Sequence, residues 1–363
     1  MNKNDVYIIH GTNYKELTKQ LLEAAVLAED IGDRKKHVAL KPNLVCAKAP
    51  SSGATTHGEL LAGVIEYLQD HGFHRISVME GSWVGERTPA SLRACGYDKI
   101  LKEYNVPFVD LQKDKSHAHD AKGMAIQVCD LALSADYMIN MPVLKGHCQT
   151  TITCALKNNK GVIPNSEKRR FHTLGLHKPI AHLNTVARND FVLVDNICGD
   201  LDFEEGGNPV VMNRILGFKD PVLCDAFVCD CMGRSVDEVP YIRMAEKLGV
   251  GCADTSQANL IFLNEDTTSG KIPMTRRVEA LARYTAPRDA CSACYGSLIH
   301  ALDRLKENGC IPKNAPAIGI GQGYKGCSGE IGVGSCTSCF AKSLLGCPPK
   351  AIDMVRFLEE HWE

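Results

Sequence analysis

The fold is decided by a stretch in which two short apolar runs, His37-Val38-Ala39-Leu40 and Ile76-Ser77-Val78-Met79, enclose an amphipathic segment at residues 58–71. Short runs that are rich in branched apolar residues predict strands. Between them, five apolar residues recur at helical spacing, namely Leu60, Leu61, Val64, Ile65 and Leu68. Gly72 follows this segment and is expected to end the helix. A strand, a helix and a second strand in this order predict a parallel pair of strands.

The same alternation extends along the first two-thirds of the chain. A helix is expected over residues 88–104, and further strands are expected at residues 106–109, 136–142, 191–195 and 260–263. We therefore predict an α/β fold, with a mostly parallel sheet and helices on both faces, in a domain of residues 1–285. Residues 265–287 are expected to join this domain to a cysteine-rich segment of residues 286–363.

The composition of the chain argues against several classes of function. The 363 residues are 44% hydrophobic, which allows a large buried core. Lys and Arg number 41 against 43 Asp and Glu, and this even balance argues against a dedicated binder of nucleic acid or of membrane surfaces. No apolar run approaches the roughly 20 residues of a membrane helix, and the N-terminus lacks the apolar region of a signal peptide. We expect a cytoplasmic protein, with a homodimer as one possible assembly.

Cysteines are concentrated near the C-terminal end: seven of the 17 lie in the last 73 residues. Two C-x-x-C pairs, Cys291/Cys294 and Cys336/Cys339, are followed by Gly346-Cys347-Pro348-Pro349. A C-x-x-C turn lets two thiolates reach one metal centre, and a disulfide framework does not fit a chain without a secretory signal. The pattern predicts metal or iron–sulfur ligation.

This cysteine segment resembles the proximal-cluster segment of nickel–iron hydrogenase small subunits. The resemblance implies a 4Fe–4S cluster held by four thiolates, which here would be Cys291, Cys294, Cys336 and Cys347. The spacing departs from that family, because only ten residues separate Cys336 from Cys347. Cys327 or Cys339 could replace Cys336 as a ligand.

Two alternatives to the cluster stay open at this point. The two C-x-x-C pairs could together form a zinc site of four thiolates, although Gly346-Cys347-Pro348-Pro349 would then have no role. Otherwise these cysteines are buried or redox-active thiols without a metal. The isolated Cys310 is expected to be a small core residue.

A second resemblance rests on polar segments of the first two-thirds. Their order and spacing resemble a broad prokaryotic family known as domain of unknown function 362, whose name implies no reaction. The matching segments are residues 41–44, 55–59, 139–147, 155–161, 194–195 and 220–225. Members of that family often carry a ferredoxin-like cluster insert, which this sequence lacks.

Several of these polar residues directly follow predicted strands. The carboxyl ends of parallel strands meet in one crevice, so we expect these side chains to converge there. Ammonium and amide groups without many carboxylates suit an anionic ligand. The predicted substrate-binding residues are Lys41, Asn43, Lys145, Lys157, Asn158 and Lys160, and the predicted catalytic residues are His147, His172 and Asp195.

Each of these residues also has an ordinary interpretation. Any single lysine of the set could be a solvated loop charge, and any single histidine could be an ordinary surface residue. His57 precedes a predicted helix, for which Thr56 is the expected N-cap, so a structural role there competes with catalysis.

The two sets of residues together predict an iron–sulfur oxidoreductase. The cluster would pass electrons to a small anionic substrate or second cofactor, His147 or His172 would supply a proton, and a protein such as a ferredoxin would donate the electrons. Two alternatives are a non-catalytic electron-transfer or cluster-stabilised binding protein, and a hydro-lyase whose cluster has only three cysteine ligands. Many oxidisable thiolates favour an anaerobic setting.

Overall fold

The computed structural model describes residues 1–265 and 276–362, which form two compact units. The first unit contains residues 1–168 and 177–265, and the second contains residues 169–176 and 276–362. The division passes through helix α8 (Asn165–Thr173). The boundary expected between residues 285 and 286 lies inside the second unit. Of the expected joining segment, residues 266–275 lie outside the described residues.

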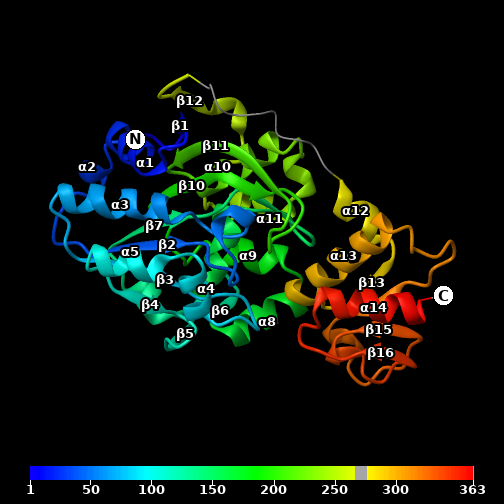
Figure 1. The fold of residues 1–363 in the computed structure, drawn as a ribbon. Helices are drawn as coiled ribbons and strands as arrows, with labels where there is room; N and C mark the ends of the chain where they lie inside the picture. Colours follow the sequence, from blue (N-terminus) through cyan, green and yellow to red (C-terminus); the bar gives the residue numbers. More distant parts are fainter. Residues whose placement is uncertain (266–275, 363) are drawn as a thin grey trace. The chain divides into compact units, whose positions relative to one another are not determined.

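The first unit is built on an eight-stranded sheet, shown in Figure 1, with the strand order β12-β1-β11-β10-β7-β2-β3-β4. Within the described chain, β11 is the one strand of this sheet that runs antiparallel to its neighbours. The prediction of a mostly parallel sheet is therefore confirmed. The strands are β1 (Asp5–His10), β2 (Val38–Pro42), β3 (Ile76–Glu80), β4 (Phe108–Asp110), β7 (Tyr137–Met141), β10 (Phe191–Asp200), β11 (Pro209–Phe218) and β12 (Asn259–Phe262).

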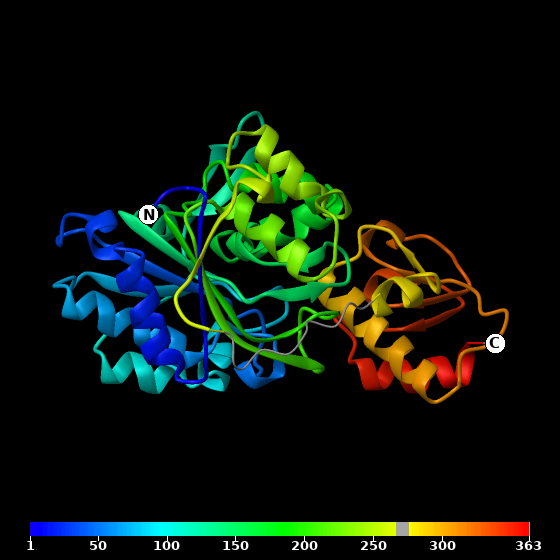
Figure 2. The same ribbon diagram turned by 90° about the horizontal axis from the view of Figure 1, so that it is seen from above.

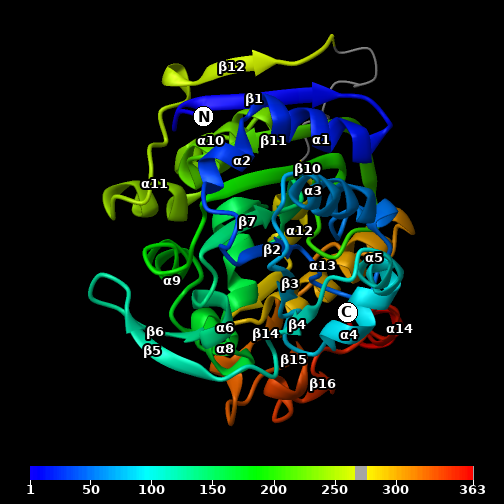
Figure 3. The same ribbon diagram turned by 90° about the vertical axis from the view of Figure 1, so that its left-hand side faces the viewer.

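Helices cover both faces of this sheet, as Figures 2 and 3 show. One face carries α1 (Tyr14–Ala24), α3 (Gly58–Asp70) and α5 (Tyr97–Glu103). The other carries α9 (His177–Leu183), α10 (Pro221–Cys231) and α11 (Pro240–Lys247). Every residue of β2, β7 and β10 is buried, as expected for central strands that are covered on both sides.

One expected helix was wrong, and three strands were not expected. The helix expected over residues 88–104 is two helices, α4 (Thr88–Ala94) and α5, because Gly96 between them has a φ of +72°. The antiparallel β11 and the hairpin β5 (Ser116–Asp120) and β6 (Ala125–Cys129) were not expected. Strand β5 is polar and largely exposed, so it lacks the apolar alternation on which strand prediction depends.

Shorter elements surround the carboxyl ends of the sheet strands. Two glycines let the hairpin strand β8 lie directly against the end of β10: a Cβ atom on Gly146 would be 2.1 Å from the Leu201 carbonyl oxygen, and one on Gly199 would be 2.0 Å from that of Leu144. The remaining elements of this unit are α2 (Leu27–Ile31), α6 (Asp130–Leu133), α7 (Ala155–Asn158), β8 (Lys145–His147), β9 (Thr151–Thr153) and 3-10 turns at Pro50–Ser52, Asn159–Val162, Val236–Glu238 and Thr255–Gln257.

The second unit has its own sheet of four parallel strands of three residues each, in the order β13-β14-β15-β16. Its helices α13 and α14 pack against each other. The elements are α12 (Arg277–Ala282), β13 (Thr285–Pro287), α13 (Ser292–Glu307), β14 (Ile318–Ile320), β15 (Ile331–Val333), β16 (Lys342–Leu344), α14 (Ala351–His361) and 3-10 turns at Gln322–Tyr324 and Ser335–Thr337.

A search of the described residues for membrane spans found no helix that combines the necessary length with sufficient apolar character.

Candidate functional site

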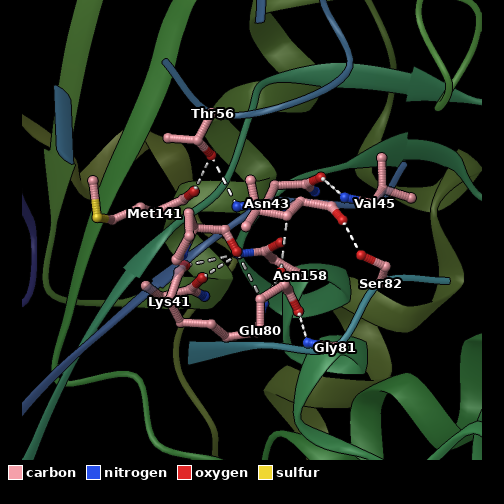
Figure 4. A network of polar contacts seen from close by, with 12 residues as sticks. Lys41, Asn43, Val45, Thr56, Glu80, Gly81, Ser82, Met141 and Asn158 are labelled. Atoms are coloured by element: carbon pink, nitrogen blue, oxygen red, sulfur yellow. Dashed lines mark hydrogen bonds and ion pairs between the residues drawn. The ribbon is translucent and has the colours of Figure 1, made fainter. Parts of the chain in front are cut away.

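A buried ion pair joins the carboxyl ends of β2 and β3. The ammonium of Lys41 lies 2.9 Å from Oε2 of Glu80, and both side chains are almost fully buried (Figure 4). Glu80 also accepts hydrogen bonds from the backbone N–H groups of Gly81 at 2.8 Å and Leu44 at 3.4 Å. A Cβ atom on Gly161 would lie 1.7 Å from Oε1 of Glu80, so the pair is enclosed by backbone.

A second glutamate, Glu204, contacts three of the predicted site residues. It forms an ion pair with Lys157 and lies 3.0 Å from Nε2 of His147. Its backbone carbonyl accepts a hydrogen bond from Lys145 at 2.8 Å. Burial alone would raise the pKa of Glu204, but the charge of Lys157 and the contact with His147 hold it well below its usual value. Glu204 is therefore an ionised anchor for these side chains.

Lys145 is held mainly by carbonyl oxygens. Its ammonium donates to the side chain of Asn43 at 3.3 Å and to the carbonyl of Ala54 at 2.5 Å, in addition to that of Glu204. Lys168 is bound in the same way, by the carbonyls of Gly81 and Ser82 at 2.8 Å each. Burial lowers the pKa of both lysines to about 8.

The structure thus brings together most of the predicted substrate-binding residues but adds two carboxylates to them. Lys41 and Lys157 are each paired with a glutamate, whereas the sequence led us to expect few carboxylates here. Asn158 donates to Asn140 at 2.7 Å and to the carbonyl of Lys41 at 3.4 Å. Glu80 could have been found from its position at a strand end. Nothing in the sequence singles out Glu204, which lies in the connection between β10 and β11.

His147 has a fixed protonation state. Its Nδ1 accepts hydrogen bonds from the backbone N–H groups of Gln149 at 3.0 Å and Thr150 at 3.1 Å, so the ring proton resides on Nε2, which faces Glu204. Burial, helped by the charge of Lys157, lowers its pKa to about 4. In this geometry His147 is neutral at pH 7 and links β8 to Glu204, so it has no second proton to supply.

The predicted catalytic residue Asp195 is paired with His57. Its Oδ2 atom lies 2.9 Å from Nδ1 of His57 and accepts the backbone N–H of the same residue at 2.7 Å. Burial on its own would lower the pKa of His57, but the charge of Asp195 and the hydrogen bond to it raise that pKa to about 10. His57 is therefore an imidazolium at neutral pH.

The expected N-cap of α3 was wrong. The N-cap residue is His57, and its side chain makes no capping bond. The hydroxyl of Thr56 instead accepts the backbone N–H of Asn43 at 2.9 Å and donates to the carbonyl of Met141 at 2.8 Å, which ties the ends of β2 and β7 together (Figure 4). This bridge places His57 beside Asp195.

A cavity of about 570 Å³ adjoins His57. It lies wholly within the first unit, and its lining includes Pro50, Ser51, His57, Glu59, Cys95 and Tyr104. The side chain of His57 is 12% exposed, so the imidazolium is the edge of a buried pair that reaches this space.

Two predicted site residues remain, His172 and Lys160. His172 is a buried residue of α8 and belongs to the second unit. Lys160 is half-buried in the turn after α7, and its charge is one of those that lower the pKa of His147.

A third cluster joins two of the sequence segments, 155–161 and 220–225. The carboxylate of Asp225 accepts the backbone N–H groups of Ala155 at 2.7 Å and Leu156 at 3.3 Å, and thereby caps α7. The Cys154 and Cys224 sulfur atoms lie 3.8 Å apart beside it, and all three side chains are buried. These three donors could hold a metal ion, but the carboxylate already satisfies the N-terminus of a helix.

In the second unit, three cysteines of the predicted cluster lie within electrostatic reach of the fourth, Cys294. Burial, followed by the charges of Cys291, Cys347 and Cys336, raises the pKa of Cys294 to about 12. Cys291 and Cys294 stand at the start of α13, Cys336 lies in the turn after β15, and Cys347 follows β16.

The other cysteines of this unit occupy different surroundings. Cys327 is half-buried, and its thiol donates to the Gly323 carbonyl at 3.8 Å. Cys339 and Cys310 are exposed, so the expectation that Cys310 is a core residue was wrong.

The spacing of the four thiols bears on the kind of metal they could hold. A tetrahedral zinc ion with Zn–S bonds of about 2.3 Å requires sulfur atoms about 3.8 Å apart. Among the described residues, only Cys154, Cys224 and Asp225 form a group of three or more metal-ligating side chains within 4.8 Å of one another. Among the described residues of the second unit, no three of these thiols lie within 4.8 Å of one another, so they are not arranged around one zinc ion.

The loop that carries Cys291 is packed against a glycine-rich segment. A Cβ atom on Gly321 would lie 2.0 Å from the Arg288 carbonyl oxygen, so the two backbones could not approach with any other residue there. This approach brings Nε2 of Gln322 to 3.6 Å from the Cys291 sulfur. Gln322 is thus a hydrogen-bond donor to one of the predicted ligands.

Comparison with known families identifies the first unit. The model of the family described as "Domain of unknown function (DUF362)" matches residues 38–230, more than half of the chain. The chain belongs to this family, as the order of its polar segments predicted. The match ends at residue 230, so the likeness of the second unit to hydrogenase small subunits rests on its cysteine motifs alone.

Individual relatives share parts of the chain. The thylakoid-associated protein sll1697 of Synechocystis sp. (strain ATCC 27184 / PCC 6803 / Kazusa) is 29% identical over 230 residues, which are 60% of this chain and 69% of that protein. The lactate racemase apoprotein from Thermoanaerobacterium thermosaccharolyticum aligns with a TM-score of 0.42 and 13% identity over 62% of this chain and 56% of that one. A structural genomics target from Thermotoga maritima aligns with a TM-score of 0.37 and 14% identity over 70% of this chain and 62% of that one.

Proposed function

We propose that this protein is an iron–sulfur oxidoreductase. In this proposal the second unit holds a 4Fe–4S cluster through Cys291, Cys294, Cys336 and Cys347, and the first unit binds a small anionic substrate. The observation that carries it is the electrostatic coupling of Cys294 to the other three thiols, since these four are the ligands that the sequence motifs predict.

The donor set of the second unit fits such a group. A cluster would supply single electrons and the positive charge that four adjacent thiolates need. Cys294 is half-buried, and burial and the neighbouring thiols raise its pKa, so the surroundings disfavour a bare thiolate. Gln322 donates toward the Cys291 sulfur, a contact that stabilises negative charge on a ligand.

The first unit would handle the proton that accompanies electron transfer. His57 carries a proton at neutral pH beside the 570 Å³ cavity, and Asp195 orients the ring. His57 is therefore better placed than His147 to protonate a substrate. Lys145 and Lys157 remain proposed anion ligands, although an anion would have to compete with the carbonyls and the carboxylate that hold them now.

The proposed setting is a reducing compartment, the cytoplasm, with a ferredoxin-like electron donor. All 17 cysteines are free thiols, which suits such a compartment.

Anaerobic purification with iron and sulfide analysis, and an EPR spectrum of the dithionite-reduced protein, tests the proposal. We expect four irons and four sulfides per chain. Serine substitution of Cys294 or Cys347 should abolish the signal, and the same substitution of Cys310, an exposed cysteine of the same unit, should leave it unchanged. Comparison of Cys336→Ser, Cys327→Ser and Cys339→Ser identifies the remaining ligand. Stoichiometric zinc without sulfide would overturn the proposal.

A further inference from the structure

A thiol completes a row of three groups, of which His57 lines the cavity. Cys198 Sγ lies 3.9 Å from Nε2 of His57, whose Nδ1 lies 2.9 Å from Asp195. The carboxylate and the thiol therefore face opposite nitrogen atoms of one imidazole ring. None of the sequence motifs included Cys198.

The pairing of β10 with β11 is irregular beside the outer members of the row. Between the pairs Asn196–Arg214 and Cys198–Val211, one residue of β10 faces two residues of β11, so the extra residue lies on β11. Bulges of this kind are common beside active sites.

We propose that Asp195, His57 and Cys198 form a relay in which the Cys198 thiol is a nucleophile toward a small carbonyl compound bound in the cavity. This proposal goes beyond the iron–sulfur function and does not depend on it, because all three residues and the cavity belong to the first unit.

The proton inventory supports this assignment. The His57 imidazolium carries a proton on each ring nitrogen. Nδ1–H donates to Asp195, and Nε2–H faces the Cys198 sulfur, which must accept that hydrogen bond. The sulfur can do so as a thiol that donates to the Pro50 carbonyl at 3.4 Å, or as a thiolate. The thiolate beside an imidazolium is the reactive form of a cysteine nucleophile. Other titratable groups near this row are Tyr14 on α1, whose ring is 5.9 Å from that of His57, Glu59 on α3 and Tyr97 on α5.

The chemical step balances without a further reagent. The thiolate sulfur bonds to the carbonyl carbon, the π electrons of the C=O bond move to the oxygen, and the Nε2 proton of His57 passes to that oxygen. The product is a neutral thiohemiacetal, and the reverse of each transfer releases the carbonyl compound. Cys198 is only 5% exposed, and Pro50 and Ser51 line the cavity next to it, so the substrate must be small.

Cys95 provides a matched comparison inside the same molecule. Cys95 lines the cavity and is 8% exposed, and its thiol contacts the hydroxyl of Thr55 at 3.2 Å and the carbonyl of Lys48 at 3.4 Å. Burial raises its pKa, and the hydrogen bond with Thr55 and the charge of Lys145 oppose this rise only in part. Any difference in reactivity between Cys198 and Cys95 thus reports on the imidazolium.

Alkylation of the whole protein by iodoacetamide, followed by peptide mass spectrometry, tests the relay. Trypsin places each thiol in a peptide with no other cysteine, residues 189–214 for Cys198 and 94–99 for Cys95. At pH 6.5 we expect Cys198 to react at least tenfold faster than Cys95. The rate of Cys95 should rise about tenfold per pH unit, because its thiol must lose a proton before it reacts.

Variants separate the relay from general loosening of the fold. His57→Gln and Asp195→Asn should slow Cys198 to the rate of Cys95 and leave Cys95 unchanged, whereas local unfolding would speed up both. Equal alkylation rates for the two cysteines at pH 6.5 in the unsubstituted protein would overturn the proposal.

Protection tests the substrate class. Millimolar acetaldehyde should slow alkylation of Cys198 but not of Cys95, and absence of protection would overturn the carbonyl assignment. The same results are expected in the Cys294→Ser variant, so failure of the cluster and failure of the relay are distinguishable.

Discussion

Two histidines of the first unit show how the partners of a residue set its charge. His57 gives Nδ1–H to Asp195 and keeps Nε2–H, so both nitrogens can carry protons. His147 also faces a carboxylate, but Nδ1 accepts two backbone N–H groups and Glu204 is already paired with Lys157. Protonation of His147 would therefore remove two hydrogen bonds, and the pKa values of the two residues shift in opposite directions.

An NMR pH titration of the imidazole groups should show this contrast. We expect His57 to remain an imidazolium up to about pH 9 and His147 to remain neutral down to about pH 5, since their pKa values are about 10 and about 4. His57→Gln and His147→Gln assign the signals. Titration of both residues near 6.5 would contradict the structure.

The same shift predicts how stability changes with pH. Because the folded pKa of His57 lies above its unfolded value of 6.5, its ion pair stabilises the fold fully below pH 6.5 and is lost as the pH rises through about 10. The stability difference between the unsubstituted protein and His57→Gln should shrink across that window.

At the scale of elements, the sequence predicted the regular parts of the first unit and missed contacts between distant parts. Strands β2, β3 and β7 have dense apolar runs, so their positions and the convergence of Lys41, Asn43 and Lys145 followed from local pattern. Glu204 could not be predicted, because its partners depend on an irregular connection folding back over β8. Asp195 was identified as a site residue, but its partner His57 lies 138 residues away in the sequence.

The turn after α7 has a glycine that the buried ion pair requires. In Gly161→Ala the new Cβ would lie 1.7 Å from Oε1 of Glu80 and 2.7 Å from the Lys41 ammonium, so the pair must separate. We expect a loss of about 3–5 kcal/mol in the free energy of unfolding, measured with denaturant. Gly96→Ala is the control: its φ is +72° but no atom lies within 4 Å of the new Cβ, so about 1–2 kcal/mol is expected. Equal losses would show that the pair is not enclosed.

At the scale of the whole molecule, two units differ in what stabilises them. The first has central strands buried on both faces, whereas the strands of the second have three residues each. The sequence predicted both the α/β sheet and a separate cysteine-rich part. It did not predict that residues 169–176 group with the second unit, because the division falls inside one continuous helix.

If the second unit holds the proposed cluster, removal of iron should affect that unit selectively. After treatment with an iron chelator, we expect faster amide hydrogen exchange across α13 and β14–β16, because metal-binding energy contributes to the folding of a small unit. Exchange in β2, β7 and β10 should be unchanged and serves as the internal control. Equal acceleration in both units, or none in either, would contradict a cluster that stabilises only the second unit.

The connection between β10 and β11 has a practical consequence for anyone who engineers this protein. Surface connections normally accept added residues, but this one carries Glu204, which pairs with Lys157 and His147. One inserted amino acid here would move Glu204 and leave these two buried side chains without their carboxylate partner. Tags and reporter modules belong instead at the tip of the β5–β6 hairpin, where Gly123 is exposed and has no neighbouring atom within 4 Å of a Cβ position.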